Sequence, residues 1–243
     1  MTSHGFQLYS LRDIDDSLAT VLDRVGATRF TGVEFAGLDM DEPDAVAKAM
    51  NDVGVSCVAS HVSLENIEAD PSGVAESINK LGGSHVVVPW LGPEHFESIT
   101  AVETAADRLS AVAEPLAEHG IQLHYHNHDQ EFVSLDGQPA LTYLLEAADG
   151  VRLELDVGWA GVAGMDPLQY LETQADRIDL VHLKDYDATA RKTVRVGTGD
   201  LDLARGIETI RTHDIDWLIY EAEDGSDSYT TLDYAADIIS GLE

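Results

Sequence analysis

Short apolar runs alternate with amphipathic stretches along the whole chain. The apolar runs are rich in Val, Leu, Ile and Tyr, which is typical of strands buried in a sheet. Each run is followed by a stretch whose apolar residues have helical spacing, so we expect parallel strands joined by helices. Eight such runs are visible, at residues 5–11, 32–37, 55–63, 85–91, 121–128, 151–158, 179–185 and 216–223.

The stretches between these runs predict eight helices, and several end at a glycine just before the next strand. Gly54, Gly82 and Gly120 stand where a left-handed residue commonly terminates a helix. Eight strand–helix units imply right-handed crossovers and closure into a (β/α)8 TIM barrel, a single domain over residues 1–243. The alternative is an open doubly wound sheet, but the chain lacks a glycine-rich phosphate loop after its first strand. The predicted helices lie at residues 17–29, 44–54, 71–83, 100–120, 139–150, 166–177, 202–214 and 228–242.

The chain is strongly acidic. Its 243 residues include 45 Asp and Glu against 14 Lys and Arg, which gives a formal charge of −31. The acids are spread along the sequence, which favours a halophilic protein whose charged surface keeps it soluble in high salt; a merely acidic mesophilic enzyme is the alternative. Such a negative surface argues against nucleic acid as a partner.

Cysteine use and the first residues bear on the compartment. Cys57 is the only cysteine, so an intrachain disulfide and a structural cysteine zinc site are both excluded. The first ten residues do not resemble a signal peptide, and no apolar run approaches the ~20 residues that span a bilayer. We therefore expect a cytoplasmic protein with no membrane partner. The oligomeric state stays open, a homo-oligomer included.

Three ionisable residues stand near the carboxyl ends of the last three strands: Asp156, His182 and Glu221. Active sites of such barrels lie at this end of the strands. Side chains alternate along a strand, and the apolar neighbours of these three residues are expected to face the helices, so the three point into the barrel. A carboxylate, an imidazole and a carboxylate that converge suit a divalent cation.

The fifth strand carries three histidines on one face. His126 lies at the depth that best matches Asp156, so we predict it as the fourth metal ligand. His128 would lie higher, toward substrate, and His124 lower, in a structural role. Glu131, a few residues further on, is expected to fold back over the pocket.

Other strand ends supply candidates for binding substrate. We expect Glu34 and His61 to line the pocket, although a loop salt bridge and a surface histidine are the plainer interpretations. Trp90 and Trp159 would form apolar walls on which a sugar ring stacks, or belong to the core. A cationic group after the seventh strand would bind an anionic group of the substrate or carry ordinary loop charges: Arg191, Lys192 and Arg195.

At these residues the chain resembles the xylose-isomerase-like barrel superfamily, which includes sugar-phosphate isomerases and epimerases, inosose dehydratases and endonuclease IV. The matching phrases run in order from the first strand to the last, so the resemblance covers essentially the whole chain. They are QLYSLRD (7–13), GVEFAG (32–37), YHNHDQEF (125–132), LELDVGWA (153–160), VHLKD (181–185), VGTGDLD (196–202) and YEAE (220–223).

The resemblance implies one divalent metal ion, often manganese, magnesium, zinc or cobalt, held by Glu, Asp, His and Glu. The last three correspond to Asp156, His182 and Glu221, but this chain has His126 where many members have glutamate. Epimerases of the superfamily use the first and last glutamates as a facing acid–base pair. The departure therefore weakens the case for a two-glutamate epimerase and strengthens that for a lyase with the same enolate chemistry.

We therefore expect a metal-dependent isomerase or epimerase that acts on a small-molecule sugar, keto-sugar or cyclitol through an enediolate; a dehydratase on a keto-sugar or inosose is the alternative. Glu221 or Glu131 would remove the proton, and His128 or Lys184 would return it or assist loss of a hydroxyl. Two other classes remain: a nuclease like endonuclease IV, which the charge opposes, and a non-catalytic sugar-binding subunit, which the His126 substitution favours.

Overall fold

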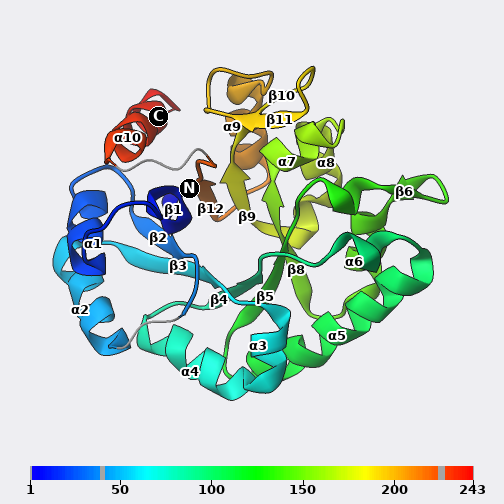
Figure 1. Ribbon diagram of the computed structural model, residues 1–243, viewed down its shortest axis with the longest axis horizontal. Helices are drawn as coiled ribbons and strands as arrows, with labels where there is room; N and C mark the ends of the chain where they lie inside the picture. Colours follow the sequence, from blue (N-terminus) through cyan, green and yellow to red (C-terminus); the bar gives the residue numbers. More distant parts are fainter. Residues whose placement is uncertain (1, 39–41, 224–227, 243) are drawn as a thin grey trace.

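Eight parallel strands close into a barrel in the computed structural model of the protein (Figure 1), as the sequence predicts. The structure describes residues 2–38, 42–223 and 228–242. Around the barrel the strand order is β1-β12-β9-β8-β5-β4-β3-β2, and every neighbouring pair is parallel. The barrel strands are β1 (Ser3–Gln7), β2 (Gly32–Phe35), β3 (Ser56–His61), β4 (His85–Val88), β5 (Gln122–His126), β8 (Val151–Asp156), β9 (Ile178–Leu183) and β12 (Trp217–Tyr220).

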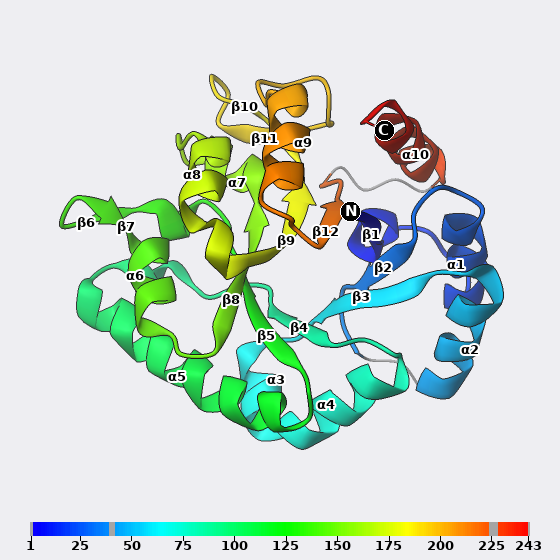
Figure 2. The same ribbon diagram turned by 180° about the vertical axis from the view of Figure 1, so that it is seen from behind.

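Helices surround the strands on the outside, as the two opposite views show (Figures 1 and 2). Gly54, Gly82 and Gly120 all have the positive φ expected of residues that end a helix. The α-helices are α1 (Leu18–Gly26), α2 (Pro43–Val53), α3 (Leu64–Ala69), α4 (Pro71–Lys80), α5 (Ile99–Glu118), α6 (Ala140–Ala147), α7 (Val157–Val162), α8 (Pro167–Gln174), α9 (Leu203–Thr212) and α10 (Thr230–Leu242). Short 3-10 helices are η1 (Leu8–Leu11), η2 (Pro93–Phe96), η3 (Gln130–Phe132) and η4 (Ala175–Arg177).

The structure contains elements that the periodicity does not predict. Two connections hold a pair of α-helices, α3 with α4 and α7 with α8. Helix α7 begins directly at Val157, because the side chain of Asp156 caps it by accepting a hydrogen bond from the backbone N–H of Trp159. Two small hairpins lie outside the barrel: β6 (Ser134–Leu135) with β7 (Gln138–Pro139), and β10 (Asp185–Asp187) with β11 (Lys192–Val194).

The apolar residues form two layers that together position the site. The larger layer lies between the strands and the helices and contains the strand residues that alternate with the inward ones, such as Leu155, Val181 and Tyr220. A small second cluster fills the lower part of the lumen: Val58, Ala59, Val87, Leu180 and Ile219. Because side chains alternate, the next inward residues above Leu180 and Ile219 are His182 and Glu221, so polar side chains meet above an apolar floor.

None of the described helices combines the length and the apolar character that a membrane span requires.

Candidate active site

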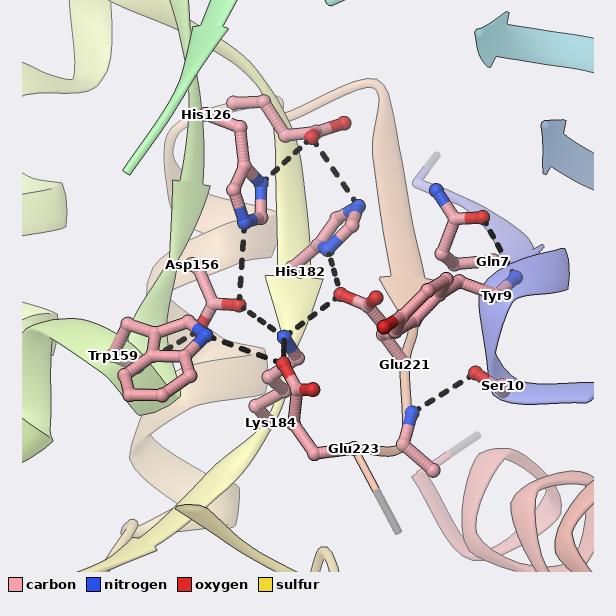
Figure 3. Close-up of polar contacts among 12 residues, drawn as sticks. Gln7, Tyr9, Ser10, His126, Asp156, Trp159, His182, Lys184, Glu221 and Glu223 are labelled. Atoms are coloured by element: carbon pink, nitrogen blue, oxygen red, sulfur yellow. Dashed lines mark hydrogen bonds and ion pairs between the residues drawn. The ribbon is translucent and has the colours of Figure 1, made fainter. Parts of the chain in front are cut away.

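Four adjacent strands bring together the four residues predicted as metal ligands. His126 ends β5, Asp156 ends β8, His182 lies on β9, and Glu221 follows β12. One ligand atom from each of the four lies within 4.8 Å of those of the others, and all four residues are buried (Figure 3). The strand register explains the convergence of three of them. Asp156 on β8 pairs with His182 on β9, and His182 in turn pairs with Ile219 on β12, two residues before Glu221.

The ammonium group of Lys184 lies between the carboxylates of Asp156 and Glu221 (Figure 3). Its Nζ is 3.0 Å from Asp156 Oδ2 and 2.8 Å from Glu221 Oε2, and it also contacts Glu223. Burial by itself lowers the pKa of Lys184, but the three carboxylates raise it above its usual range. Lys184 is therefore held as a cation and suits donation of a hydrogen bond to a negatively charged oxygen.

Asp156 is fixed through its backbone as well as its side chain. The Asn127 side chain accepts a hydrogen bond from the Asp156 N–H (3.0 Å) and donates one to the Asp156 carbonyl oxygen (3.2 Å). At the same time Oδ1 of Asp156 caps α7, which leaves Oδ2 to face His126 Nε2 at 3.7 Å and Lys184. Asn127 thus holds the end of β8 against the end of β5.

A second layer of charged groups lies beneath these ligands, and two glutamates on barrel strands form its core. Glu34 Oε2 lies 2.6 Å from His182 Nε2 and Glu154 Oε2 lies 2.9 Å from His126 Nδ1; both glutamates are completely buried. His61 joins the layer, with its Nε2 at 3.2 Å from Glu154 and 3.4 Å from Glu34. Glu34 therefore lies below the pocket floor, where its carboxylate contacts two imidazoles. We expected it to line the pocket instead.

The charges in this layer stabilise one another. Burial raises the pKa of Glu34, but His61 and His182 outweigh it and hold that pKa well below its usual range. Burial lowers the pKa of His61, yet Glu34 and Glu154 raise it to about 10. Burial likewise opposes the charge on His182, and Glu154 and Glu34 raise its pKa well above the ordinary value. Burial dominates at His126 and lowers its pKa well below the ordinary value, so this ring is neutral.

The upper rim of the site is formed by His128 and Trp159. Their rings lie 5.3 Å apart, and the Trp159 indole N–H donates to Glu223 Oε1 at 3.3 Å. His128 is also 5.1 Å from the His126 ring. Burial and the nearby Lys184 lower the pKa of His128 to about 4, so it is neutral near pH 7. Both residues are only partly buried, unlike the four ligands.

Two other candidates lie away from the ligand cluster. The carboxylate of Glu131 accepts hydrogen bonds from the Tyr125 hydroxyl (2.6 Å) and the backbone N–H of His128 (2.9 Å). Tyr125 belongs to the layer between strands and helices, so Glu131 points away from the lumen instead of folding back over the pocket.

Trp90 follows β4 with 54% of its surface exposed, so it is not a core residue. His124 is buried, and its Nε2 lies 3.0 Å from Asp179 Oδ2.

Two cavities flank the strand ends. One of about 240 Å³ is lined by Lys184, Glu221 and Glu223 on the barrel side and by residues 192–196 of the β10–β11 hairpin and the loop after it. Lys192 and Arg195, from the predicted cationic group, are among its lining residues, and the Arg195 guanidinium lies 4.7 Å from the centre of the Tyr234 ring. A second cavity, of about 650 Å³, reaches His61 from the side of β2, β3 and β4.

The upper donor set fits a divalent transition-metal ion. Two imidazoles and two carboxylates offer the nitrogen and oxygen ligands that Mn²⁺, Co²⁺ and Zn²⁺ accept, whereas Mg²⁺ prefers oxygen alone. The ring of His126 turns Nε2 toward Asp156, and His182 turns Nδ1 toward Glu221 Oε2 at 2.8 Å, so both imidazoles face the carboxylates. A second set of donors, deeper in the lumen, is also close enough to hold an ion: His61, His126, Glu154 and His182.

Three residues beside the ligands are not among the predicted site residues, although they lie within the matching phrases: Asn127, Glu154 and Glu223. The alternation of side chains does place Glu154 and Glu223 inside, but it does not say what they contact. Asn127 stands between two histidines at a strand end, which is the one local sign of its role.

Comparison with known proteins agrees with this geometry. The family model of the xylose isomerase-like TIM barrel matches residues 22–241. The inosose dehydratase of Geobacillus kaustophilus is 26% identical over 218 residues, which are 78% of this chain and 70% of that protein.

Solved structures share the fold at lower sequence identity. A sugar phosphate isomerase/epimerase from Parabacteroides distasonis superposes with a TM-score of 0.84 at 20% identity, over 98% of this chain and 93% of that one. The probable 3-DHS dehydratase of Bacillus anthracis gives a TM-score of 0.80 at 15% identity, over 98% and 99%. With the family model matched over nearly its whole length, the chain belongs to the xylose isomerase-like TIM barrel family.

Proposed function

We propose that this protein is a divalent-metal-dependent isomerase or epimerase that acts on a small sugar, keto-sugar or cyclitol through an enediolate intermediate. The observation that supports it most is the convergence of His126, Asp156, His182 and Glu221 at the carboxyl ends of four adjacent strands, with ligand atoms within 4.8 Å of one another. Membership of a family whose named relatives are isomerases, epimerases and dehydratases agrees with this proposal.

A divalent cation held by these four side chains would act as a Lewis acid on a substrate carbonyl and so acidify the adjacent C–H bond. Glu221 is the proposed base, because it lines the 240 Å³ cavity and is kept ionised by Lys184 and His182 against the effect of burial, which alone would raise its pKa. Lys184 lines the same cavity as a cation, so it can stabilise negative charge that develops on a substrate oxygen and donate a proton.

The remaining proposed roles concern substrate. His128 is a second proton carrier at the rim, beside Trp159, which would pack against the sugar ring. His61 faces the larger cavity and would contact substrate from the opposite side of the barrel mouth. Glu131 is not given a catalytic role here, because its carboxylate is bound to Tyr125 outside the lumen.

Elimination of water is the second candidate reaction. Two observations favour it: the chain has His126 where a facing acid–base glutamate would stand, and its curated relative is an inosose dehydratase. In that reaction Glu221 would remove the proton, and Lys184, fixed as an ammonium ion, would protonate the departing hydroxyl.

Solvent deuterium uptake separates these reactions. Purified protein loaded with Mn²⁺ or Co²⁺ is incubated in D2O with a panel of keto-sugars and inososes, and the products are followed by NMR and mass spectrometry. An epimerase or isomerase incorporates deuterium without change of oxidation level or loss of water, whereas a dehydratase yields a product 18 Da lighter. Glu221→Gln should abolish either signal. If no substrate of the panel exchanges a proton while a sugar still binds, a non-catalytic sugar-binding protein is the better description.

A further inference from the structure

Two of the four proposed ligands are histidines, and each is backed by a buried carboxylate from the layer below. Glu154 lies two residues before Asp156 on β8, on the same inward face, and its Oε2 is 2.9 Å from His126 Nδ1. Glu34 stands in the same relation to His182, at 2.6 Å from Nε2. The two imidazoles thus lie between an upper pair of carboxylates and a lower pair.

This geometry fixes the tautomer of His126. An ionised carboxylate only accepts hydrogen bonds, so the proton of the neutral ring must be on Nδ1, facing Glu154. The lone pair is then on Nε2, which is the nitrogen that faces Asp156 Oδ2. Without Glu154 the ring would be free to carry its proton on either nitrogen or to turn over, and half of these states could not bind a cation there.

The contact between His126 and Glu154 also sets the negative charge around the cation. His126 is a neutral ligand, so the upper set has only the two negative charges of Asp156 and Glu221 against the cation and Lys184. A hydrogen bond from the ring to Glu154 makes Nε2 more basic and brings a third negative charge within one ring's width. The same Oε2 also lies 3.2 Å from His61 Nε2 and 3.3 Å from His182 Nε2, so Glu154 shares its charge among three rings, whereas its Oε1 accepts no hydrogen bond from any described residue.

On the basis of the proposed metal site, we infer that Glu154 is a positioning residue that acts with His126 as one ligand unit. The imidazole supplies the ligand atom, and the carboxylate behind it supplies orientation and charge. Glu154 would not bind the cation itself. Its loss could therefore be compensated by a change at residue 126, whereas the loss of a ligand could not. The site should tolerate loss of Glu154 only if residue 126 itself is a carboxylate.

A double-mutant cycle on metal affinity tests this inference. The variants are Glu154→Gln, His126→Glu and the two together, and affinity for Co²⁺ is measured by competition with a chromogenic chelator. Glu154→Gln should weaken Co²⁺ binding about 10- to 100-fold in the natural background. In the His126→Glu background, Glu154→Gln should instead strengthen Co²⁺ binding. An orienting group is no longer needed there, and the carboxylates at 126 and 154 would repel each other. The Co²⁺ visible absorption spectrum should also change in Glu154→Gln, which reports altered ligand geometry.

Glu131→Gln is the matched control, since it makes the same substitution at a carboxylate that is equally buried but bonded to Tyr125 outside the lumen. Its Co²⁺ affinity should equal that of the natural protein. If Glu154→Gln does not fold, Glu154→Asp, which keeps the charge but cannot reach Nδ1, should still weaken Co²⁺ binding relative to the natural protein, because the ring loses its orienting contact.

The result that overturns the inference is unchanged Co²⁺ affinity in Glu154→Gln, or an equal loss in both backgrounds. Failure of the proposed metal site looks different. In that case the natural protein itself would bind Co²⁺ no better than Asp156→Asn does, whatever residue stands at 154.

Discussion

Asp156 is held in the site by its backbone as well as by both oxygens of its side chain. Its backbone is paired with the Asn127 side chain, its Oδ1 caps α7, and its Oδ2 faces His126 and Lys184. The sequence predicts that this carboxylate points inward, because Leu155 and Val157 on either side are apolar. It does not predict Asn127 or Glu154, because a side chain that orients a ligand is recognised only by what it touches.

Asp156→Asn should abolish tight metal binding while preserving the fold. The amide is nearly isosteric and leaves the Asn127 pairing intact, but it removes a negative charge that binds the cation directly. We expect an affinity loss greater than the about 100-fold that second-layer changes produce. Metal content after dialysis, measured by inductively coupled plasma mass spectrometry, checks this. Asp166→Asn, at the N-terminus of α8, is the control and should keep its metal; equal metal content in both variants would refute the assignment.

At the scale of elements, the phase of each barrel strand follows from its sequence, whereas the additions to the barrel do not. Alternation of apolar and polar residues on β8 and β9 places Asp156 and His182 inside, as predicted, and Glu154 lies on the same inward face. The β10–β11 hairpin is not predicted because its strands are three residues each, and the loop after it is held by one side chain at the start of β10, Asp185.

Asp185 should prove essential for the order of the loop that follows this hairpin. Its carboxylate is buried and accepts backbone hydrogen bonds at 2.9 Å from Gly197, Gly199 and Leu201. Asp185→Ala would leave these N–H groups without their acceptor, and we expect a loss of about 3 kcal/mol in the free energy of unfolding. Urea denaturation measures it. Since the hairpin lines the cavity beside Glu221, KM should rise more than metal affinity falls; a stability loss below about 1 kcal/mol would contradict this view of the loop.

Glu131, on η3, should make stability depend on pH. Burial raises the pKa of this carboxyl to about 7, against hydrogen bonds from Tyr125 and His128 that lower it. The folded protein binds this proton more tightly than the unfolded chain does, so the proton adds to the free energy of unfolding. This added stability is complete below about pH 4.5 and is lost as pH rises through about 7. It amounts to about 3 kcal/mol.

Glu131→Gln cannot ionise, so its unfolding free energy should fall less than that of the natural protein between pH 5 and pH 8. Chemical denaturation at a series of pH values compares the two proteins, and the effect of the many surface carboxylates cancels in the difference. Identical slopes for both proteins would show that Glu131 is already ionised in the folded state at pH 5.

At the scale of the whole molecule, the barrel could be predicted because the same strand–helix unit recurs eight times and each repeat supports the others. The reaction could not be predicted in the same way. It depends on which groups the strand ends hold near one another, and the replacement of an expected carboxylate by His126 acquires meaning only beside Glu154.

The net charge of −31 predicts a strong dependence of stability on salt. Surface carboxylates repel one another in the compact state, and raising the ionic strength shortens the screening length from about 10 Å at 0.1 M to about 3 Å at 1 M. The urea midpoint should therefore rise steadily from 0.1 M to 2 M KCl. A flat response over this range would favour an acidic protein with no adaptation to high salt.

The proposed chemistry requires that one cation bind between β5, β8, β9 and β12. Anomalous diffraction from crystals grown with Co²⁺ or Zn²⁺ would locate that cation. We predict a single peak about 2.0–2.2 Å from a nitrogen or oxygen of each of His126, Asp156, His182 and Glu221. A peak among His61, His126, Glu154 and His182 instead, or no peak at the strand ends, would contradict the account.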